Sequence, residues 1–194
     1  MKKRLTTGKI ILIVVLILVA AVLACGGYYF SHLKASNGQA RGVISSLEDL
    51  IPGYALDAEN EDPDENFTPG RDPLESFEVD GRQIVGALDI PALNLRAPVL
   101  DKDQKEAFFV TWISGSPVKG TFRLEGGYED VFFKLAKLKP GDRVIFTDMD
   151  GVRYVYEVTT QYHLKDWAEA TNDLLLCYPA DDQTDFVVGC TRVM

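Results

Sequence analysis

The sequence predicts a mainly β domain, a closed or nearly closed barrel with one or two short helices, behind an N-terminal membrane-spanning helix. Two observations lead to this prediction. From about Arg82 onward, short runs rich in Val, Ile, Phe and Tyr are bounded by Gly, Pro and Asp, as is typical of closed β-architectures. Residues 10–30 form an uncharged, mostly apolar run of 21 residues, the length with which an α-helix crosses the hydrocarbon layer of a membrane.

Length and charge limit the number of domains and the class of partner. Of the 194 residues, 164 follow the apolar run, which is enough for one domain and a tail. Lys2, Lys3, Arg4 and Lys9 supply +4 and no acid precedes residue 31, so the remainder carries −13 within a total of −9. Because a nucleic-acid-binding domain needs the opposite sign, we predict no nucleic-acid partner.

Residues 1–30 are predicted to be a cytoplasmic tip and a transmembrane signal anchor. Cations precede the apolar run and no cationic cluster follows it, which places the N-terminus in the cytoplasm and the acidic remainder outside the cell membrane. A cleaved signal peptide is one alternative, although no Ala-x-Ala site follows cleanly. A lipoprotein cleavage site around Cys25 is another. In each alternative the domain lies outside the cell membrane.

Residues 31–81 are predicted to be a stalk helix followed by an acidic linker. Val43, Ile44, Leu47 and Leu50 form a short helical stripe within residues 39–50. Between residues 57 and 80, ten acids stand against one arginine, and three prolines are interspersed, which favours an extended chain. The acids at 57–62 lack the glycine and the terminal glutamate of a calcium loop, so we predict no metal site and no cofactor.

Residues 82–194 are predicted to form the barrel domain. A hairpin turn is expected at residues 148–151, one helix at 128–138 and a second short helix at 165–170. Strands are expected at residues 84–90, 94–100, 121–125, 143–147, 153–160, 174–178 and 186–193.

Three stretches of this domain resemble the sortases, membrane-anchored cysteine transpeptidases of Gram-positive cell surfaces. Residues 86–99 are similar to the first sortase hairpin, a glycine-x-apolar-x-Ile-Pro-x-Leu-x-apolar-x-x-Pro-Val pattern. Residues 133–142 and 147–158 are similar to the helix of the family and to the hairpin after it. The resemblance spans residues 83–194 and implies a sortase-like closed β-barrel. It also implies an acyl-enzyme mechanism with three groups: a thiolate nucleophile, a histidine acid and an arginine beside the thiolate.

Only one of the three catalytic groups is found at its expected position, which we interpret as a degraded triad. Cys177 stands at the position of the nucleophile, with Leu176 in place of a threonine, and it fits a nucleophile and a buried structural thiol about equally well. Gly127 occupies the histidine position and cannot transfer a proton. Asp185 occupies the arginine position, where a carboxylate disfavours the thiolate. A solvated residue at the edge of the loop is the other interpretation of Asp185.

Other residues in the sequence are poor substitutes for the missing groups. His163 and Tyr128 are the candidate acids, and a solvated surface position is the more common fate of a histidine such as His163. Arg192 lies seven residues beyond Asp185, an odd step that turns it to the opposite face of the strand. If residues 174–178 and 186–193 pair as a hairpin, Cys177 faces residue 187, and Cys190 is then too distant for a disulfide. We therefore expect two free thiols.

These residues favour a membrane-anchored, extracytoplasmic, non-catalytic sortase homologue that acts as a binding or scaffold module. Its partner would be a sorting peptide of a surface protein or a membrane protein. The alternative is an active transpeptidase that anchors surface proteins through an acyl-enzyme on Cys177. A third hypothesis is a structural ectodomain of a membrane complex, which crosslinking in intact cells would distinguish from a peptide-binding groove.

Overall fold

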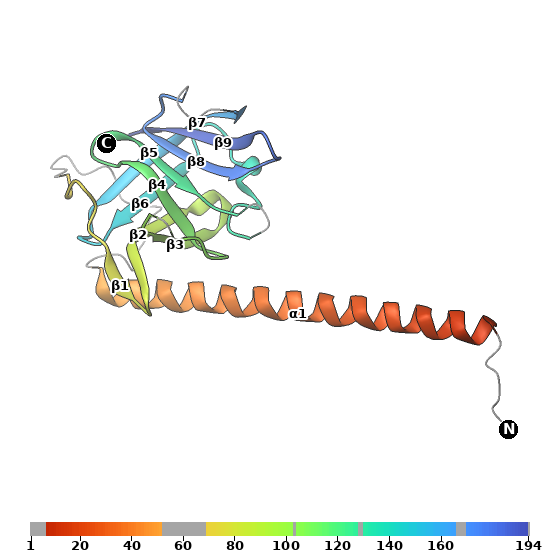
Figure 1. Ribbon diagram of the computed structural model, residues 1–194. Coiled ribbons are helices and arrows are strands. Elements are labelled where there is room, and N and C mark those ends of the chain that lie inside the picture. The colour runs from red at the N-terminus through yellow and green to blue at the C-terminus, as the bar shows by residue number, and fades with distance from the viewer. Residues whose placement is uncertain (1–6, 52–68, 103, 128–129, 166–169, 194) are drawn as a thin grey trace.

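The computed structural model describes residues 7–51, 69–102, 104–127, 130–165 and 170–193. One long helix precedes a mainly β domain (Figure 1). In chain order the elements are α1 (Thr7–Leu50), β1 (Phe77–Val79), β2 (Arg82–Ile90), the 3₁₀-helix η1 (Pro91–Leu93), β3 (Leu95–Leu100), β4 (Val110–Ser116), β5 (Gly120–Glu125), the 3₁₀-helix η2 (Leu135–Lys137), β6 (Arg143–Asp148), β7 (Arg153–Leu164), β8 (Leu174–Pro179) and β9 (Asp185–Arg192).

The strands form one sheet that closes on itself. Their order is β1-β2-β3-β4-β5-β8-β9-β7-β6, and β2 pairs with β6 as well as with β3. Pairing is antiparallel except for β3–β4 and β5–β8, which are parallel. This arrangement confirms the predicted mainly β, closed sheet. It brings β5 and β8 side by side from positions some fifty residues apart in the sequence.

The barrel interior holds the main hydrophobic core. Alternate residues of the strands point into it, as the period of two requires. On β8, for example, Leu174, Leu176 and Tyr178 belong to this core, whereas Leu175 and Cys177 belong to a smaller cluster on the other face of the sheet. The burial pattern therefore shows to which face of the sheet each β8 side chain projects.

The C-terminal part of α1 packs against the outside of the barrel through a second hydrophobic core (Figure 1). Val43 and Leu47 of the predicted stalk stripe have no exposed surface there, whereas Leu50 is 57% exposed. The predicted stalk helix is thus the end of one continuous 44-residue helix, and it is part of the packed domain. The members of this core are Ala40, Val43, Ile44, Leu47, Ile51, Val79, Ile84, Ala87, Leu100 and Phe109.

The acidic stretch predicted as an extended linker is described only from residue 69. From residue 69 onward, this stretch contacts the barrel. The backbone N–H of Gly70 donates to the Tyr154 hydroxyl at 2.8 Å, and Leu74 is buried in the main core. β1 then adds to the edge of β2. Residues 52–68, which include the rejected calcium motif, lie outside the described residues.

All seven predicted strands are present, and two strands were not predicted. β1 is only three residues long. β4 contains Gly115, whose φ of 72° lies at one of the two shifts of register against β5. The predicted hairpin turn connects β6 and β7, where the backbone N–H of Gly151 donates to the carbonyl of Asp148 at 3.1 Å.

The helix predicted at 128–138 is described from residue 130, and it consists of turns and η2 instead of an α-helix. The hydrogen-bond pattern of this segment explains why no α-helix forms. Leu135 and Leu138 donate to the carbonyls three residues earlier, which is the 3₁₀ pattern, and Pro140 then prevents continuation. Most of the short helix predicted at 165–170 lies outside the described residues.

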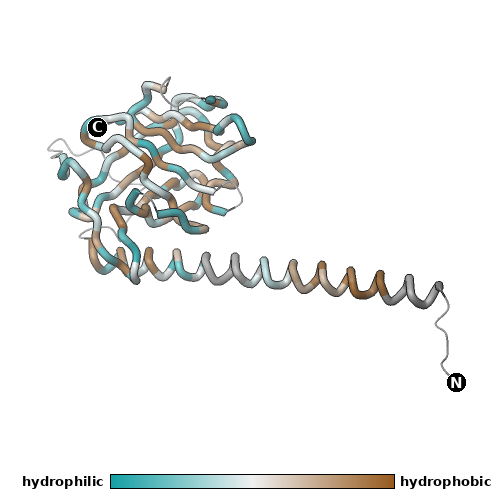
Figure 2. Tube along the Cα trace, in the orientation of Figure 1, coloured by the Kyte–Doolittle hydropathy of each residue, from teal (hydrophilic) through white to brown (hydrophobic). Residues whose placement is uncertain are grey.

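Within the described part of the chain, we find no helix with both the length and the apolar character needed to cross a membrane. The predicted span at 10–30 includes side chains outside that part, those of residues 10–13 and of Phe30. Figure 2 shows a hydrophobic stretch on the part of α1 that extends away from the barrel.

Candidate active site

Cys177 lies on β8 between two neighbouring strands that bring charged groups to its face. It stands opposite Glu125 of β5 in the parallel pair and opposite Val187 of β9 in the antiparallel pair. Residues directly opposite each other in a sheet project their side chains to the same face. The predicted pairing of Cys177 with residue 187 is confirmed, and Cys177 and Cys190 are both free thiols.

The thiol of Cys177 is fully buried. It has no exposed surface and packs in the small outer cluster with Ala170, Leu175 and Val187, against which Tyr162 is also packed. Its Sγ lies 3.5 Å from the backbone carbonyl of Leu124 and donates a weak hydrogen bond to it. A thiol in this environment behaves as a small apolar side chain.

Burial and two carboxylates raise the pKa of Cys177 far above the usual range of a thiol. Burial is the largest cause, because the charged thiolate would lose its hydration. Glu125 and then Asp185 add to the increase, whereas Lys105 and Arg123 oppose it. The balance strongly favours the neutral thiol, which is the unreactive form.

Asp185 is a close neighbour of the thiol on the same face. It is the first residue of β9 and pairs with Pro179, two residues along from the pair of Cys177 with Val187. Because side chains alternate along a strand, Asp185, Val187 and Cys177 project to one face. The structure therefore places the Asp185 carboxylate on the face of the thiol, where it raises the pKa of Cys177.

Gly127 lies just beyond the end of β5, beside the strand that carries the thiol. The backbone N–H of the preceding Gly126 donates to the carbonyl of Cys177 at 3.0 Å. A Cβ atom placed on Gly127 would lie 2.5 Å from Oδ1 and 2.6 Å from Oδ2 of Asp130. The carboxylate of Asp130 thus fills the space in which a side chain at position 127 would begin.

The other candidates from the sequence do not reach the thiol. His163 pairs with Phe186, is exposed, and contacts that ring edge-on at 5.3 Å between centroids, on the face opposite Cys177. The guanidinium of Arg192 lies over the Tyr154 ring at 5.1 Å, which confirms that it projects to the opposite face. Tyr128 lies outside the described residues.

Four charged neighbours of this site were not predicted from the sequence. Arg123 and Glu125 share the face of Cys177 because their partners are Leu175 and Cys177. Lys105 forms an ion pair with Glu125, and Asp130 occupies the space beside Gly127. The alternation of β5 could have indicated that Arg123 and Glu125 share a face, but the parallel partner of β5 cannot be read from the spacing of residues.

A cleft of about 320 Å³ opens beside the two glycines. Glu125, Gly127 and Asp130 contribute to its wall, and Cys177 does not. The described residues contain no group of three or more His, Cys, Asp or Glu side chains that could hold a metal ion. The complete lining is Lys105, Glu106, Ala107, Phe109, Thr111, Glu125, Gly126, Gly127, Asp130 and Pro179.

Comparison with known proteins identifies the family. A family model of the sortase domain matches residues 88–192, more than half of the chain. The chain belongs to the sortase family. No curated protein sequence matches it.

Solved structures of sortases are similar to this chain, and the first of the two below supports the same fold. Sortase C1 from Streptococcus agalactiae is similar with a TM-score of 0.50 and 20% identity, over 60% of this chain and 71% of that one. Sortase A from Listeria monocytogenes is similar with a TM-score of 0.49 and 19% identity, over 57% of this chain and 88% of that one. At these identities the similarity concerns the fold alone.

Proposed function

We propose that this sortase-family chain is a membrane-anchored, extracytoplasmic binding or scaffold module, and that it does not perform cysteine transpeptidation. The observation that carries the proposal is the state of Cys177, which is fully buried beside the carboxylates of Glu125 and Asp185. Acyl transfer begins with attack by a thiolate, and this environment opposes formation of the thiolate.

Among the described residues, neither the family's histidine position nor His163 offers Cys177 the proton donor that the mechanism requires. The leaving amine needs a general acid within hydrogen-bonding reach. Gly127 has no side chain, and His163 projects to the other face of the sheet. Asp185 is an acceptor when ionised and gives no donor to a developing oxyanion. A degraded triad, with Gly127 and Asp185 at the positions of histidine and arginine, accounts for all these features.

The membrane-anchored part of the proposal is supported by the distal part of α1. Large apolar side chains between Val14 and Tyr29 are exposed and contact no part of the barrel, with Leu23 and Val22 at 71%. Soluble proteins rarely leave such a continuous apolar surface in water. With the cationic tip in the cytoplasm, the barrel would lie outside the cell membrane, where a sorting peptide or a membrane protein could be its partner.

Covalent capture tests the catalytic part of this proposal. The purified barrel with α1 is incubated with a thiol-reactive sorting-signal peptide, and the adduct is located by mass spectrometry. We expect Cys177 to react no faster than the same thiol in the unfolded chain. Cys177→Ser identifies the labelled residue, and Cys190 serves as an internal buried thiol. Rapid labelling that depends on the peptide sequence would overturn the proposal.

One observation favours the alternative function, an active transpeptidase with a Cys177 acyl-enzyme. Arg123 lies on the face of Cys177 and lowers its pKa, although its effect is smaller than those of the two carboxylates. A cation from β5 could stabilise charge on a substrate where the last strand supplies none. If this alternative holds, Arg123→Gln abolishes capture of the peptide, while the alkylation rate of the unfolded chain stays unchanged.

A further inference from the structure

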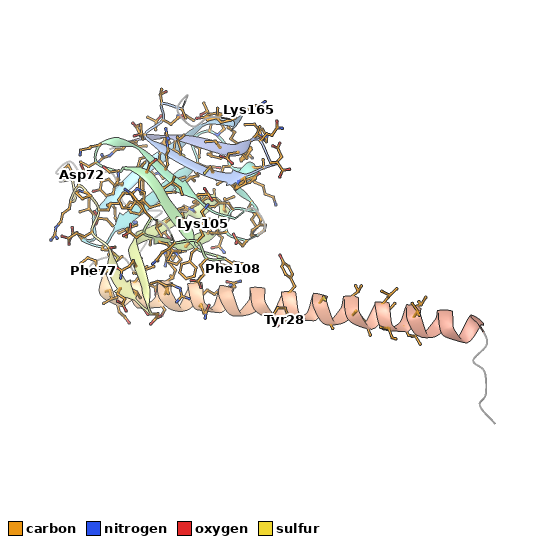
Figure 3. The ribbon with its side chains drawn as sticks, viewed as in Figure 1. Tyr28, Asp72, Phe77, Lys105, Phe108 and Lys165 are labelled. Carbon is orange, nitrogen blue, oxygen red and sulfur yellow. The ribbon has the colours of Figure 1, made fainter. Side chains whose placement is uncertain are left out.

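A second cleft, of about 480 Å³, lies where α1 meets the barrel, away from Cys177. One wall is α1 from Asn37 to Ile44, and the other consists of the start of β3 and residues 130–134. Figure 3 shows Phe108, which also lines the cleft, close to the helix. The lining is Asn37, Ala40, Arg41, Ile44, Asn94, Leu95, Arg96, Ala97, Phe108, Asp130, Val131, Phe133 and Lys134.

Cations outnumber acids in the lining of this cleft. Three cations, Arg41, Arg96 and Lys134, line it with one acid, Asp130, in a chain of net charge −9. Arg96 is bound by Asp89 at 2.6 Å and by Glu48 at 2.8 Å.

Two of the cations remain available on opposite walls. In the part of the chain that the structure describes, neither Arg41 nor Lys134 forms an ion pair. A ligand with an anionic group could therefore approach both of them.

Apolar side chains stand beside these cations. Phe133 is 53% exposed, and the Lys134 Nζ lies 5.0 Å from the centre of its ring. Phe108 and Ile44 line the interior of the cleft. Adjacent cationic and apolar surfaces suit a ligand that combines an anionic head with an apolar body.

The continuous helix fixes the height of the cleft above the proposed membrane span. Eight residues separate Tyr29 from Asn37, and at 1.5 Å per residue this is about 12 Å along the helix. The headgroup layer on each side of a bilayer is about 5–8 Å thick. The lower end of the cleft would therefore lie within about one Debye length, roughly 8 Å, of the headgroups.

We propose that this cleft binds the phosphate headgroup of an anionic phospholipid in the membrane that anchors α1. This inference rests on the proposed membrane anchoring and is independent of the catalytic state of Cys177. Arg41 and Lys134 face the phosphate from the two walls at the outer edge of the headgroup layer, and Phe133 lies beside them. The lipid would hold the barrel in one orientation against the membrane surface.

The test uses the full chain in lipid nanodiscs. Hydrogen–deuterium exchange of residues 37–44 and 130–134 is compared in phosphatidylcholine alone and with increasing fractions of phosphatidylglycerol. We expect phosphatidylglycerol to slow exchange in both segments. The double variant Arg41→Gln/Lys134→Gln should need about 25-fold more anionic lipid for the same protection, since each cation near an anionic surface contributes about fivefold to binding. Lys165→Gln, on the side of the barrel away from α1 (Figure 3), should behave as the parent chain.

The other outcomes separate the possible failures. Inorganic phosphate added to phosphatidylcholine nanodiscs should give no protection, and equal protection would overturn the lipid assignment. The proposal that the cleft binds lipid would be overturned if exchange in the two segments did not depend on lipid composition. It would also be overturned if the double variant and the parent chain needed the same fraction of anionic lipid for protection. A chain that fails to float with phosphatidylcholine vesicles would refute the membrane anchoring in the proposed function. A chain that floats with these vesicles but shows no protection by phosphatidylglycerol would refute only the lipid-binding cleft.

Discussion

Glu125 and Cys177 stand directly opposite each other in the parallel pair of β5 and β8, on the face that Asp185 also occupies. Two carboxylates therefore flank a thiol that is already deprived of water. The family mechanism needs a cation at this place, because a nearby positive charge lowers the pKa of a thiol and a negative one raises it. The electrostatic balance around Cys177 is thus set by the β8–β9 hairpin together with β5, which is distant from it in sequence.

Reversing the charge of Asp185 should lower the pKa of Cys177. In Asp185→Arg a carboxylate that disfavours the thiolate becomes a cation that favours it, and a neighbouring charge commonly shifts a pKa by about 1–3 units. We expect Asp185→Asn to give a smaller decrease. The measurement is the alkylation rate of Cys177 at about pH 8, below the range in which the domain loses stability, because this rate follows the thiolate fraction; Cys177→Ser is the blank. Asp182→Arg, an exposed acid in the β8–β9 turn, is the matched control. An unchanged alkylation rate in Asp185→Arg would show that Asp185 does not act on the thiol.

Placing a histidine at position 127 should slightly destabilise the fold unless Asp130 is shortened. The Asp130 carboxylate lies where a Cβ atom on Gly127 would be, so Gly127→His forces one of them to move. Because the carboxylate atoms are the end of a side chain that can rotate away, we expect a small loss of stability, about 0.5–1 kcal/mol. We expect Asp130→Ala to recover most of the loss, and chemical denaturation of both single variants and the double variant measures the coupling. Additive effects of the two changes would contradict the contact.

The strands were well predicted from the sequence because successive residues of each strand alternate between the two faces of the sheet. One face lies in the main core, and the other lies in solvent or in one of the smaller cores. The sequence predicted the pairing of Cys177 with residue 187 because a short turn fixes the register of a hairpin. It missed β4, where Gly115, with its positive φ, lies at one of the two shifts of register against β5 that interrupt the alternation.

The charges around the candidate site were harder to predict than the strand that carries it. Asp185 could be placed because it follows the hairpin turn. Glu125 and Arg123 could not, because a parallel partner is chosen by the closure of the whole barrel and not by local spacing. Asp130 reaches Gly127 through a turn where a helix had been predicted. The packing of α1 was also missed, because a helical stripe does not identify the surface that it covers.

Leu47 should contribute much more to the stability of the domain than Leu50, although both belonged to the same predicted stripe. Leu47 is fully buried in the core between α1 and the barrel, and Leu50 is 57% exposed. We expect Leu47→Ala to reduce the free energy of unfolding by about 2–5 kcal/mol, and Leu50→Ala to change it by less than about 0.5 kcal/mol. Denaturant titration of the full chain in detergent, followed by Trp fluorescence, measures both. Equal effects would mean that α1 is not part of the cooperative unit.

The domain should lose stability as pH rises above about 9. Burial raises the pKa of Cys190 to about 12 and that of Tyr154 to about 12, and it also raises those of Cys177 and Tyr156. Each group is protonated in both states below its unfolded pKa, so its contribution is fully present there. Above that pKa the unfolded chain releases the proton first and binds fewer protons than the native state, so stability falls until the folded pKa is passed.

The slope of this loss identifies the groups involved. Each such group lowers the free energy of unfolding by about 1.4 kcal/mol for every pH unit between its two pKa values. Denaturation midpoints between about pH 8 and 11 should therefore fall less steeply in Cys190→Ala, because that variant has one buried acid fewer. Val188→Ala removes an equally buried, non-titrating side chain of the same strand, so it should lower stability at every pH and leave the slope unchanged. Parallel curves for Cys190→Ala and the parent chain would show that the native state does not hold this thiol in its neutral form.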